Sequence, residues 1–452
     1  MLTKYIPFYK RNLKLALPII LSQAGQVVVQ QVDTMMVGYV GTPELAASAF
    51  ANSIFIIGMI IVMGFTFGLT PAVGHSLVKK DNKYLSKLLF NAYVLNLGFA
   101  VIISILLYIT SFFFNHMGQD VLIEELSKPY FYTLVLSILP LIIFMTNKQF
   151  AEGIGDTKNA MYVTISSNLL NVALNYVLIF GKFGAPEMGL LGAGIATLIS
   201  RVYMASSFMI IFYYNRHFKH YIKGIFLYRI NKVLIGKLFS LGIPISMQLL
   251  LEVLAFGLSA IMAGWLGIIP LAAHQVAIGL ASVTFMIVVG IGSATTIRVS
   301  HQYSQHDLHG LMMAAKASIH IVLVFMSFTA ISFLIFRNYL PMIYTNDIAV
   351  INLAAQLLII AGVFQLFDGL QAVLISILRG FGDVKHAMVY AFIAYILVNL
   401  PLGYYLGFKL ELGIIGIWIA FITGLGAAAI MFLWRFRVIY YQLKFDKEFN
   451  KQ

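Results

Sequence analysis

Three acidic residues stand out because each lies inside a long apolar stretch: Asp33, Glu252 and Asp368. A carboxylate at the centre of a bilayer costs on the order of 3 kcal/mol, even on the most lenient insertion scale. Such a residue is usually kept where it binds an ion, a proton or a cationic ligand. Nearly all the other acids are expected in loops or tails. These three carboxylates are therefore the first candidates for a functional site.

Glutamines accompany the acids at spacings of three or four residues, which place them on the same helical faces. The three stripes are Gln23, Gln26, Gln30 and Asp33; Gln248 and Glu252; and Gln365, Asp368 and Gln371. Each stripe should face protein or water rather than lipid. Hydrogen bonding between helices is an equally good explanation for the glutamines alone.

A further polar group lies in the first half of the chain. Asn171 and Asn175 are four residues apart, and Thr197 follows in the next apolar stretch. Carboxylate, amide and hydroxyl oxygens together would suit a hard cation such as Na⁺. The same groups around Asp33 would equally suit a hydrogen-bonded proton site, and amides that only join helices are a third possibility. The candidate Na⁺ ligands are Asp33, Asn171, Asn175, Glu252 and Asp368.

One basic residue, Arg201, lies in the middle of an apolar stretch. It could pair with an acid, or its long side chain could extend to the membrane surface. The sequence does not identify its partner.

The elements that carry these residues are long apolar runs. The chain of 452 residues is 60% hydrophobic and 10% charged, whereas about a quarter of a soluble chain is charged. A transmembrane helix needs about 20 mostly apolar residues. Twelve runs qualify, at 14–39, 50–74, 88–113, 127–148, 160–181, 188–214, 238–265, 272–298, 313–336, 349–377, 386–408 and 412–437.

The chain also reads as two copies of one sequence, related by a constant offset in residue number. Matched positions include Pro18 and Pro244, Gly41 and Gly267, Thr70 and Thr296, Asp81 and Asp307, and, with small shifts, Gly153 and Gly380. Six spans per copy give both copies the same orientation, so the halves are parallel repeats with the site near their interface. The three acids do not repeat: Glu252 falls on Gln26, and Asp33 falls on Ser259.

The predicted fold is therefore an all-α polytopic membrane protein. Its twelve transmembrane helices form two six-helix bundles related by an internal parallel repeat. We expect an N-terminal lobe at 1–214, a cytoplasmic basic linker at 215–237 and a C-terminal lobe at 238–452.

The net charge of +13 follows the topology. Basic residues gather in the even-numbered connections and the tails: Lys79, Lys80, Lys83, Lys87, Lys158, Arg216, Lys219, Lys223, Arg229, Lys232, Lys237, Arg379, Lys385, Arg435, Arg437, Lys444, Lys447 and Lys451. The opposite side holds only Lys128, Lys182, Arg337 and Lys409. This asymmetry places both termini in the cytoplasm and favours contact with anionic lipids over nucleic acid.

Two pairs of motifs recur in the two copies. The first pair is Gln31 to Gly41 with Glu-Leu-Ala-Ala after it, and its copy Ala-Gly-Trp-Leu-Gly followed by Leu-Ala-Ala-His-Gln. The second pair is the turns Gly-Ile-Gly-Asp-Thr-Lys and Arg-Gly-Phe-Gly-Asp-Val-Lys. These motifs resemble those of the multidrug and toxic compound extrusion (MATE) family. The resemblance covers nearly the whole chain. The acids at Glu252 and Asp368 are most similar to the NorM-like branch.

The resemblance implies cation binding at Glu252 and Asp368 in the second lobe, and coupling at Asp33 with Asn171, Asn175 and Thr197 in the first. The chain departs from the family pattern at one position. Some members carry a tyrosine four residues before the second-lobe aspartate, where this chain has Phe364. Phe364 supplies no oxygen, so that site would need water or Gln365 to complete it.

The expected function is secondary active multidrug efflux by alternating access, with organic, mostly cationic amphipathic compounds exchanged for Na⁺ or H⁺. A flippase for lipid-linked oligosaccharides is the alternative, although it would need several cavity arginines or lysines for pyrophosphate. No catalytic cluster or phosphate loop is apparent, so no enzyme and no cofactor are expected. We expect a monomer in the cytoplasmic (inner) membrane.

Overall fold

The structure is a computed structural model that describes residues 2–77 and 81–446. Lys79, Lys80, Lys447 and Lys451 lie outside these ranges. The described residues form helices, and twelve helical segments are long and apolar enough to cross a membrane, which confirms the predicted number. The chain is an integral multi-pass membrane protein.

The first six spans consist of α1 (Ile6–Gly38), α2 and α3 (Thr42–Phe67, Leu69–Leu77), α4 (Asn82–Thr110), α5 and α6 (Val121–Leu136, Ile138–Gly153), α7 (Lys158–Phe180) and α8 (Gly189–Tyr214). The short helix α9 (Arg216–Ile222) follows. The last six consist of α10 (Lys232–Trp265), α11 (Ile268–Ser304), α12 (Leu308–Phe336), α13 (Ile348–Phe381), a composite eleventh span and α16 (Gly413–Phe445).

The eleventh span is not a uniform α-helix. It runs through α14 (Val384–Phe392), a π-helical segment (Ile393–Asn399), α15 (Leu400–Tyr404) and a second π-helical segment (Tyr405–Lys409). Pro401 lies in α15 and has no N–H to donate, which disturbs the regular hydrogen-bond pattern around it. π-Helical turns are rare and often accompany functional sites.

The chain divides into two compact units, and the division differs from the predicted boundaries. One unit is Leu21–Ser246; the other joins Met1–Ile20 to Met247–Gln452. The boundaries between the units follow Ile20 and Ser246, which are separated by the same offset as Pro18 and Pro244 and so are equivalent positions of the repeat. The first segment of each copy is therefore exchanged: it belongs to the unit that the other copy forms. We call these the N unit (Leu21–Ser246) and the C unit (the remainder).

Specific contacts hold the two exchanged segments. Asn12 is buried and donates to the Ala314 carbonyl at 3.0 Å and to Ser318 Oγ at 2.8 Å, all within the C unit. Ser246 Oγ donates to the Ile61 carbonyl at 2.8 Å within the N unit. Polar side chains of these helices thereby fix the start of α1 in the C unit and the start of α10 in the N unit.

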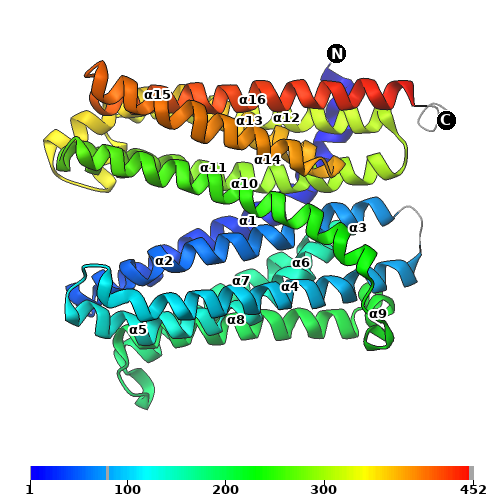
Figure 1. The fold of residues 1–452 in the computed structure, drawn as a ribbon, viewed down its shortest axis with the longest axis horizontal. Helices are drawn as coiled ribbons and strands as arrows, with labels where there is room; N and C mark the ends of the chain where they lie inside the picture. Colours follow the sequence, from blue (N-terminus) through cyan, green and yellow to red (C-terminus); the bar gives the residue numbers. More distant parts are fainter. Residues whose placement is uncertain (1, 78–80, 447–452) are drawn as a thin grey trace. The chain divides into compact units, whose positions relative to one another are not determined.

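The basic linker belongs to the N unit. Its helix α9 packs on α4 and α8, and Phe218 stacks on Phe212 with ring centroids 4.5 Å apart. Within the same unit, α7 and α8 lie side by side (Figure 1).

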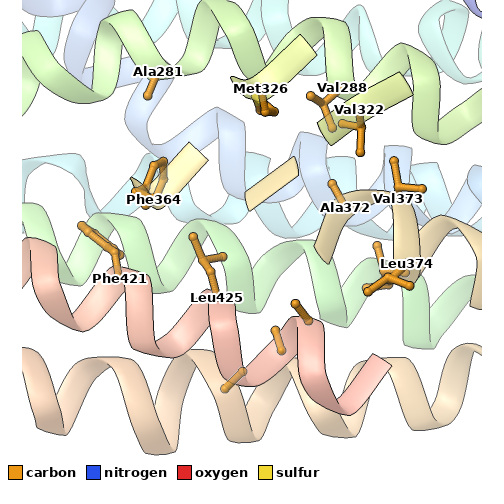
Figure 2. Close-up of a cluster of buried hydrophobic side chains, with 14 of the residues drawn as sticks. Ala281, Val288, Val322, Met326, Phe364, Ala372, Val373, Leu374, Phe421 and Leu425 are labelled. Carbon is orange, nitrogen blue, oxygen red and sulfur yellow. The ribbon is translucent and has the colours of Figure 1, made fainter. Parts of the chain in front are cut away.

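The core of the C unit forms around α13, which packs against α11, α12 and α16 (Figure 1). Figure 2 shows apolar side chains from these four helices meeting, with Phe364 of α13 beside Phe421 of α16 and Met326 of α12 nearby. This core holds α13, the helix that carries Asp368.

The two units share their local packing. A Cβ on Gly153 would meet Val73 Cβ at 2.7 Å and the Thr70 carbonyl at 3.1 Å. A Cβ on Gly380 would meet Val299 Cβ at 2.7 Å and the Thr296 carbonyl at 3.1 Å. The same close contact between two helices therefore occurs once in each unit. It aligns Gly153 of α6 with Gly380 of α13 in the repeat.

Candidate functional site

Two of the three predicted acids meet in a polar cluster of the C unit. Gln248 and Glu252 lie one turn apart on α10, and Gln248 Nε2 donates to Glu252 Oε2 at 3.0 Å. Asp368 lies on α13 with only 5% of its surface exposed. Asp368 and Glu252 act on each other electrostatically. The structure therefore brings together two carboxylates that lie far apart in the sequence.

A second hydrogen-bonded pair holds Asp368. Gln371 Nε2 donates to Asp368 Oδ1 at 3.3 Å, and the Tyr395 hydroxyl donates to Gln371 Oε1 at 2.9 Å. All three residues are buried. Tyr395 belongs to the π-helical segment Ile393–Asn399 and interacts electrostatically with both carboxylates. Sequence reasoning missed Tyr395, because a π-helical turn rotates side chains away from the positions that helical spacing predicts.

Arg379 completes this cluster. The sequence predicted that it lies in a connection between spans, and this prediction is wrong. It lies in the last turn of α13, inside the tenth span, where it is partly buried. Its Nη2 donates to Gln248 Oε1, and its charge interacts with that of Glu252. The Gly380 that follows it packs against Val299, so the helix continues past the point where hydropathy falls.

One oxygen of each carboxylate remains uncommitted. Glu252 Oε1 and Asp368 Oδ2 accept no hydrogen bond from any residue in the described ranges. Two carboxylates and one guanidinium leave one net negative charge when all three are ionised. The C-unit cluster, defined as Gln248, Glu252, Asp368, Gln371, Arg379 and Tyr395, can therefore attract one monovalent cation.

Gln365 lies apart from this cluster, although its spacing from Asp368 is helical. Its Oε1 accepts hydrogen bonds from Thr329 at 2.6 Å and Thr284 at 3.3 Å, on α12 and α11. Gln365 therefore joins three helices, which is the alternative the sequence had left open. Phe364 packs among Phe256, Trp418 and Phe421 in the apolar core.

In the N unit, Asp33 meets the predicted asparagines. Asn175 Nδ2 donates to Asp33 Oδ1 and, at 3.3 Å, to Asn171 Oδ1. Asn171 and Asn175 are buried, whereas Asp33 is partly buried. Asn175 Oδ1 is buried and has no partner among the described residues. The group has both donors and acceptors, so it suits a hydrogen-bonded carboxyl group as well as an ion.

Other predicted residues of the N unit are not joined to Asp33. Gln30 is exposed, Gln26 and Thr197 are partly buried, and none of the three has a side-chain hydrogen bond to Asp33 in the described part of the chain. Sharing a helical face with Asp33 did not give Gln26 or Gln30 a hydrogen bond with it in the described residues.

The structure identifies the surroundings of Arg201. Its Nη1 donates to Ser137 Oγ at 2.6 Å, and its guanidinium lies over the Phe55 ring, 5.4 Å from the centroid. Its charge interacts with Asp33 and Tyr130. Within the described residues Arg201 makes no direct ion pair, so it balances the charge of Asp33 through space.

A fourth acid inside a span, Glu152, is buried and was wrongly expected in a loop. It lies in α6 with 3% of its surface exposed, one turn after the equally buried Lys148. Glu152 Oε1 and Lys148 Nζ are 3.9 Å apart. By the repeat, Glu152 occupies the place of Arg379, since Gly153 and Gly380 make the same contacts. The same structural position thus carries opposite charges in the two units.

Comparison with known proteins matches this architecture. The family model MatE matches twice, at residues 18–177 and 244–405, and the two matches begin at Pro18 and Pro244, which are a matched pair of the repeat. A multidrug resistance protein NorM of Photobacterium profundum is 34% identical over 441 residues, covering 95% of each chain. A multidrug resistance protein MdtK of Yersinia pseudotuberculosis is 30% identical over 445 residues, covering 96% of each.

Solved structures agree on the fold. One is the outward-facing conformation of a multidrug resistance MATE family transporter, with a TM-score of 0.87 at 20% identity over 97% of both chains. Another is the eukaryotic MATE transporter AtDTX14, with a TM-score of 0.85 at 20% identity, covering 97% of this chain and 98% of the other.

Proposed function

Since the chain belongs to the MatE family, we propose that it is a secondary active multidrug efflux antiporter of the cytoplasmic membrane. It exports organic, mostly cationic amphipathic compounds by alternating access, in exchange for Na⁺ or H⁺. The observation that carries the proposal is the C-unit cluster, in which Glu252 and Asp368 each keep one uncommitted oxygen.

The net charge of the C-unit cluster explains why drug and coupling ion are exchanged for each other. The cluster holds one net negative charge, which either a drug cation or a coupling ion can neutralise. A second cation would bring an uncompensated positive charge into a partly buried, low-dielectric region, where Coulomb energies are several times larger than in water. The two ligands therefore exclude each other, and entry of the coupling ion expels the drug.

The N unit contributes the second half of the coupling machinery in this proposal. Asp33 keeps its hydrogen bond from Asn175, which holds the carboxyl group in position for an incoming proton or ion, with Asn171 as the neighbouring acceptor. Arg201 compensates the charge of Asp33 when no cation is bound. Thr197 and Gln26 lie outside this hydrogen-bonded group, so we assign them no role in ion binding.

The names of the relatives favour drug export over a flippase, since NorM and MdtK are both called multidrug resistance proteins. Three basic residues inside the spans point the same way. Arg201, Arg379 and Lys148 each face an acid of their own unit, so these three are not available to hold a pyrophosphate. Export needs no catalytic step and no cofactor, and we propose a monomer with both termini in the cytoplasm.

Transport in reconstituted vesicles tests the proposal. Purified protein in proteoliposomes is given a Na⁺ gradient or a proton gradient separately, with a fluorescent organic cation as cargo. We expect one of the two gradients to drive cargo movement against its own gradient, and Glu252→Gln with Asp368→Asn to abolish it. Failure of both gradients to move any organic cation would refute the antiport.

A further inference from the structure

Arg379 interacts electrostatically with Glu252 without pairing directly with it. Within the described residues it has no ion pair, and its guanidinium reaches Glu252 through the buried side chain of Gln248. Gln248 turns its carbonyl toward the arginine and its amide nitrogen toward the carboxylate. This relay holds the positive charge near Glu252 and leaves one oxygen of the carboxylate free for a ligand.

The repeat shows that the frame does not require an arginine at this position. Gly153 and Gly380 make the same close contacts, yet the preceding residue is Glu152 in one unit and Arg379 in the other. The equivalents of Gln248 and Glu252 in the N unit are Ser22 and Gln26. The arginine, the relay and the acid therefore occur together in the C unit and are all replaced in the N unit.

We propose that Arg379 is a tethered counter-cation that limits the C-unit cluster to one bound monovalent cation at a time, and so makes coupling ion and drug mutually exclusive. This inference rests on the proposed antiport function and explains its coupling. Glu252, Asp368, Arg379 and Tyr395 are the titratable groups of the cluster, and Gln248 and Gln371 are its neutral partners. Without Arg379 the cluster would hold two net negative charges and could accept two cations.

Equilibrium binding of tetraphenylphosphonium, a permanent monovalent cation, tests the inference with the purified full chain. In the wild type, its apparent Kd is expected to rise in proportion to the Na⁺ concentration, as for strict competition. In Arg379→Gln, the Kd in the absence of Na⁺ should fall on the order of tenfold, because one nearby positive charge is gone. The rise with Na⁺ should then level off, because both cations bind together.

Two variants separate charge from structure. Arg379→Lys keeps the charge and should keep the competition. Glu252→Gln/Arg379→Gln restores one net negative charge and should restore competition that Arg379→Gln has lost. Arg435→Gln is the matched control, because Arg435 is an arginine of the same unit that pairs with Asp383 at 2.5 Å; it should behave like the wild type.

The outcomes distinguish this inference from the function on which it rests. If Na⁺ does not displace the probe from the wild type, the same titration is made with protons. Displacement by neither ion refutes antiport through this cluster. Two outcomes overturn only the role of Arg379 and leave the antiport function standing. In the first, the competition seen in the wild type persists unchanged in Arg379→Gln. In the second, the competition is lost in Arg379→Gln and the double variant does not restore it.

Discussion

Asn175 donates a hydrogen bond to Asp33, from a helix that lies 142 positions further along the sequence. The bond joins α1 to α7 inside the N unit, and Asn175 also donates to Asn171. Its amide nitrogen is thus shared between an acid and a neighbouring amide. Among the described residues, this is the side-chain hydrogen bond that the Asp33 carboxyl group accepts.

Replacing Asn175 with leucine should weaken ion coupling at Asp33. A hydrogen bond to a charged group is worth about 1.5–3 kcal/mol, so ion-driven export should fall about ten- to a hundred-fold. Drug efflux under an imposed ion gradient measures the change, with Asp33→Asn for comparison. Leu169→Ala, on the same helix but 69% exposed, should retain wild-type export. Equal export by Asn175→Leu and the wild type would remove Asn175 from the coupling site.

Neutralising Glu252 and Asp368 separately should show that the two carboxylates act as one site. Glu252→Gln leaves the cluster with no net charge, and so does Asp368→Asn, so both should lose cation binding and export together. Binding of an organic cation and its efflux are measured on the same preparations. Glu125→Gln, an exposed acid in α5, serves as the control and should change neither. Full export by either cluster variant would separate that carboxylate from the site.

Tyr395→Phe removes one hydroxyl group and keeps the ring. The hydroxyl donates to Gln371, which donates to Asp368. A neutral hydrogen bond contributes about 1 kcal/mol, so ion affinity should weaken about fivefold with little loss of thermal stability. The ion concentration that gives half-maximal export reports the effect. An unchanged ion dependence would show that Tyr395 only packs against the site.

The buried pair of Lys148 and Glu152 should behave differently, as a structural pair. Breaking a buried ion pair by removing one partner costs about 3–5 kcal/mol, whereas replacing both by apolar residues is often neutral. Lys148→Met and Glu152→Leu should each lower the Tm in detergent, and the double variant should recover it. A double variant as unstable as either single one would contradict this assignment.

Much of the fold was predictable, because the lengths of the apolar runs and the internal repeat can both be read directly from the sequence. Twelve apolar runs predicted the twelve spans, and the constant offset between matched residues predicted two equivalent frames. Asp33, Glu252 and Asp368 were found because a carboxylate is conspicuous in the middle of an apolar run.

The errors arose where hydropathy falls before the helix ends. Glu152 and Arg379 lie in the last turns of α6 and α13, next to glycines that pack closely on another helix. A charged residue there looks like part of a loop, because apolar composition does not show which way a final turn faces. Spacing alone left two explanations open for Gln30 and Gln365, because a shared helical face does not determine which neighbouring helix each residue meets.

The exchange of segments at Ile20 and Ser246 has a consequence for the chain as a gene product. A fragment that ends between the two copies contains neither unit in full, since each unit takes its opening segment from the other half. A half-length ancestor with the same exchange would have been complete only as a domain-swapped dimer, in which each copy gives its first segment to the other. Fusion of two such copies would make that partnership permanent, and it would free each copy to evolve its own acids.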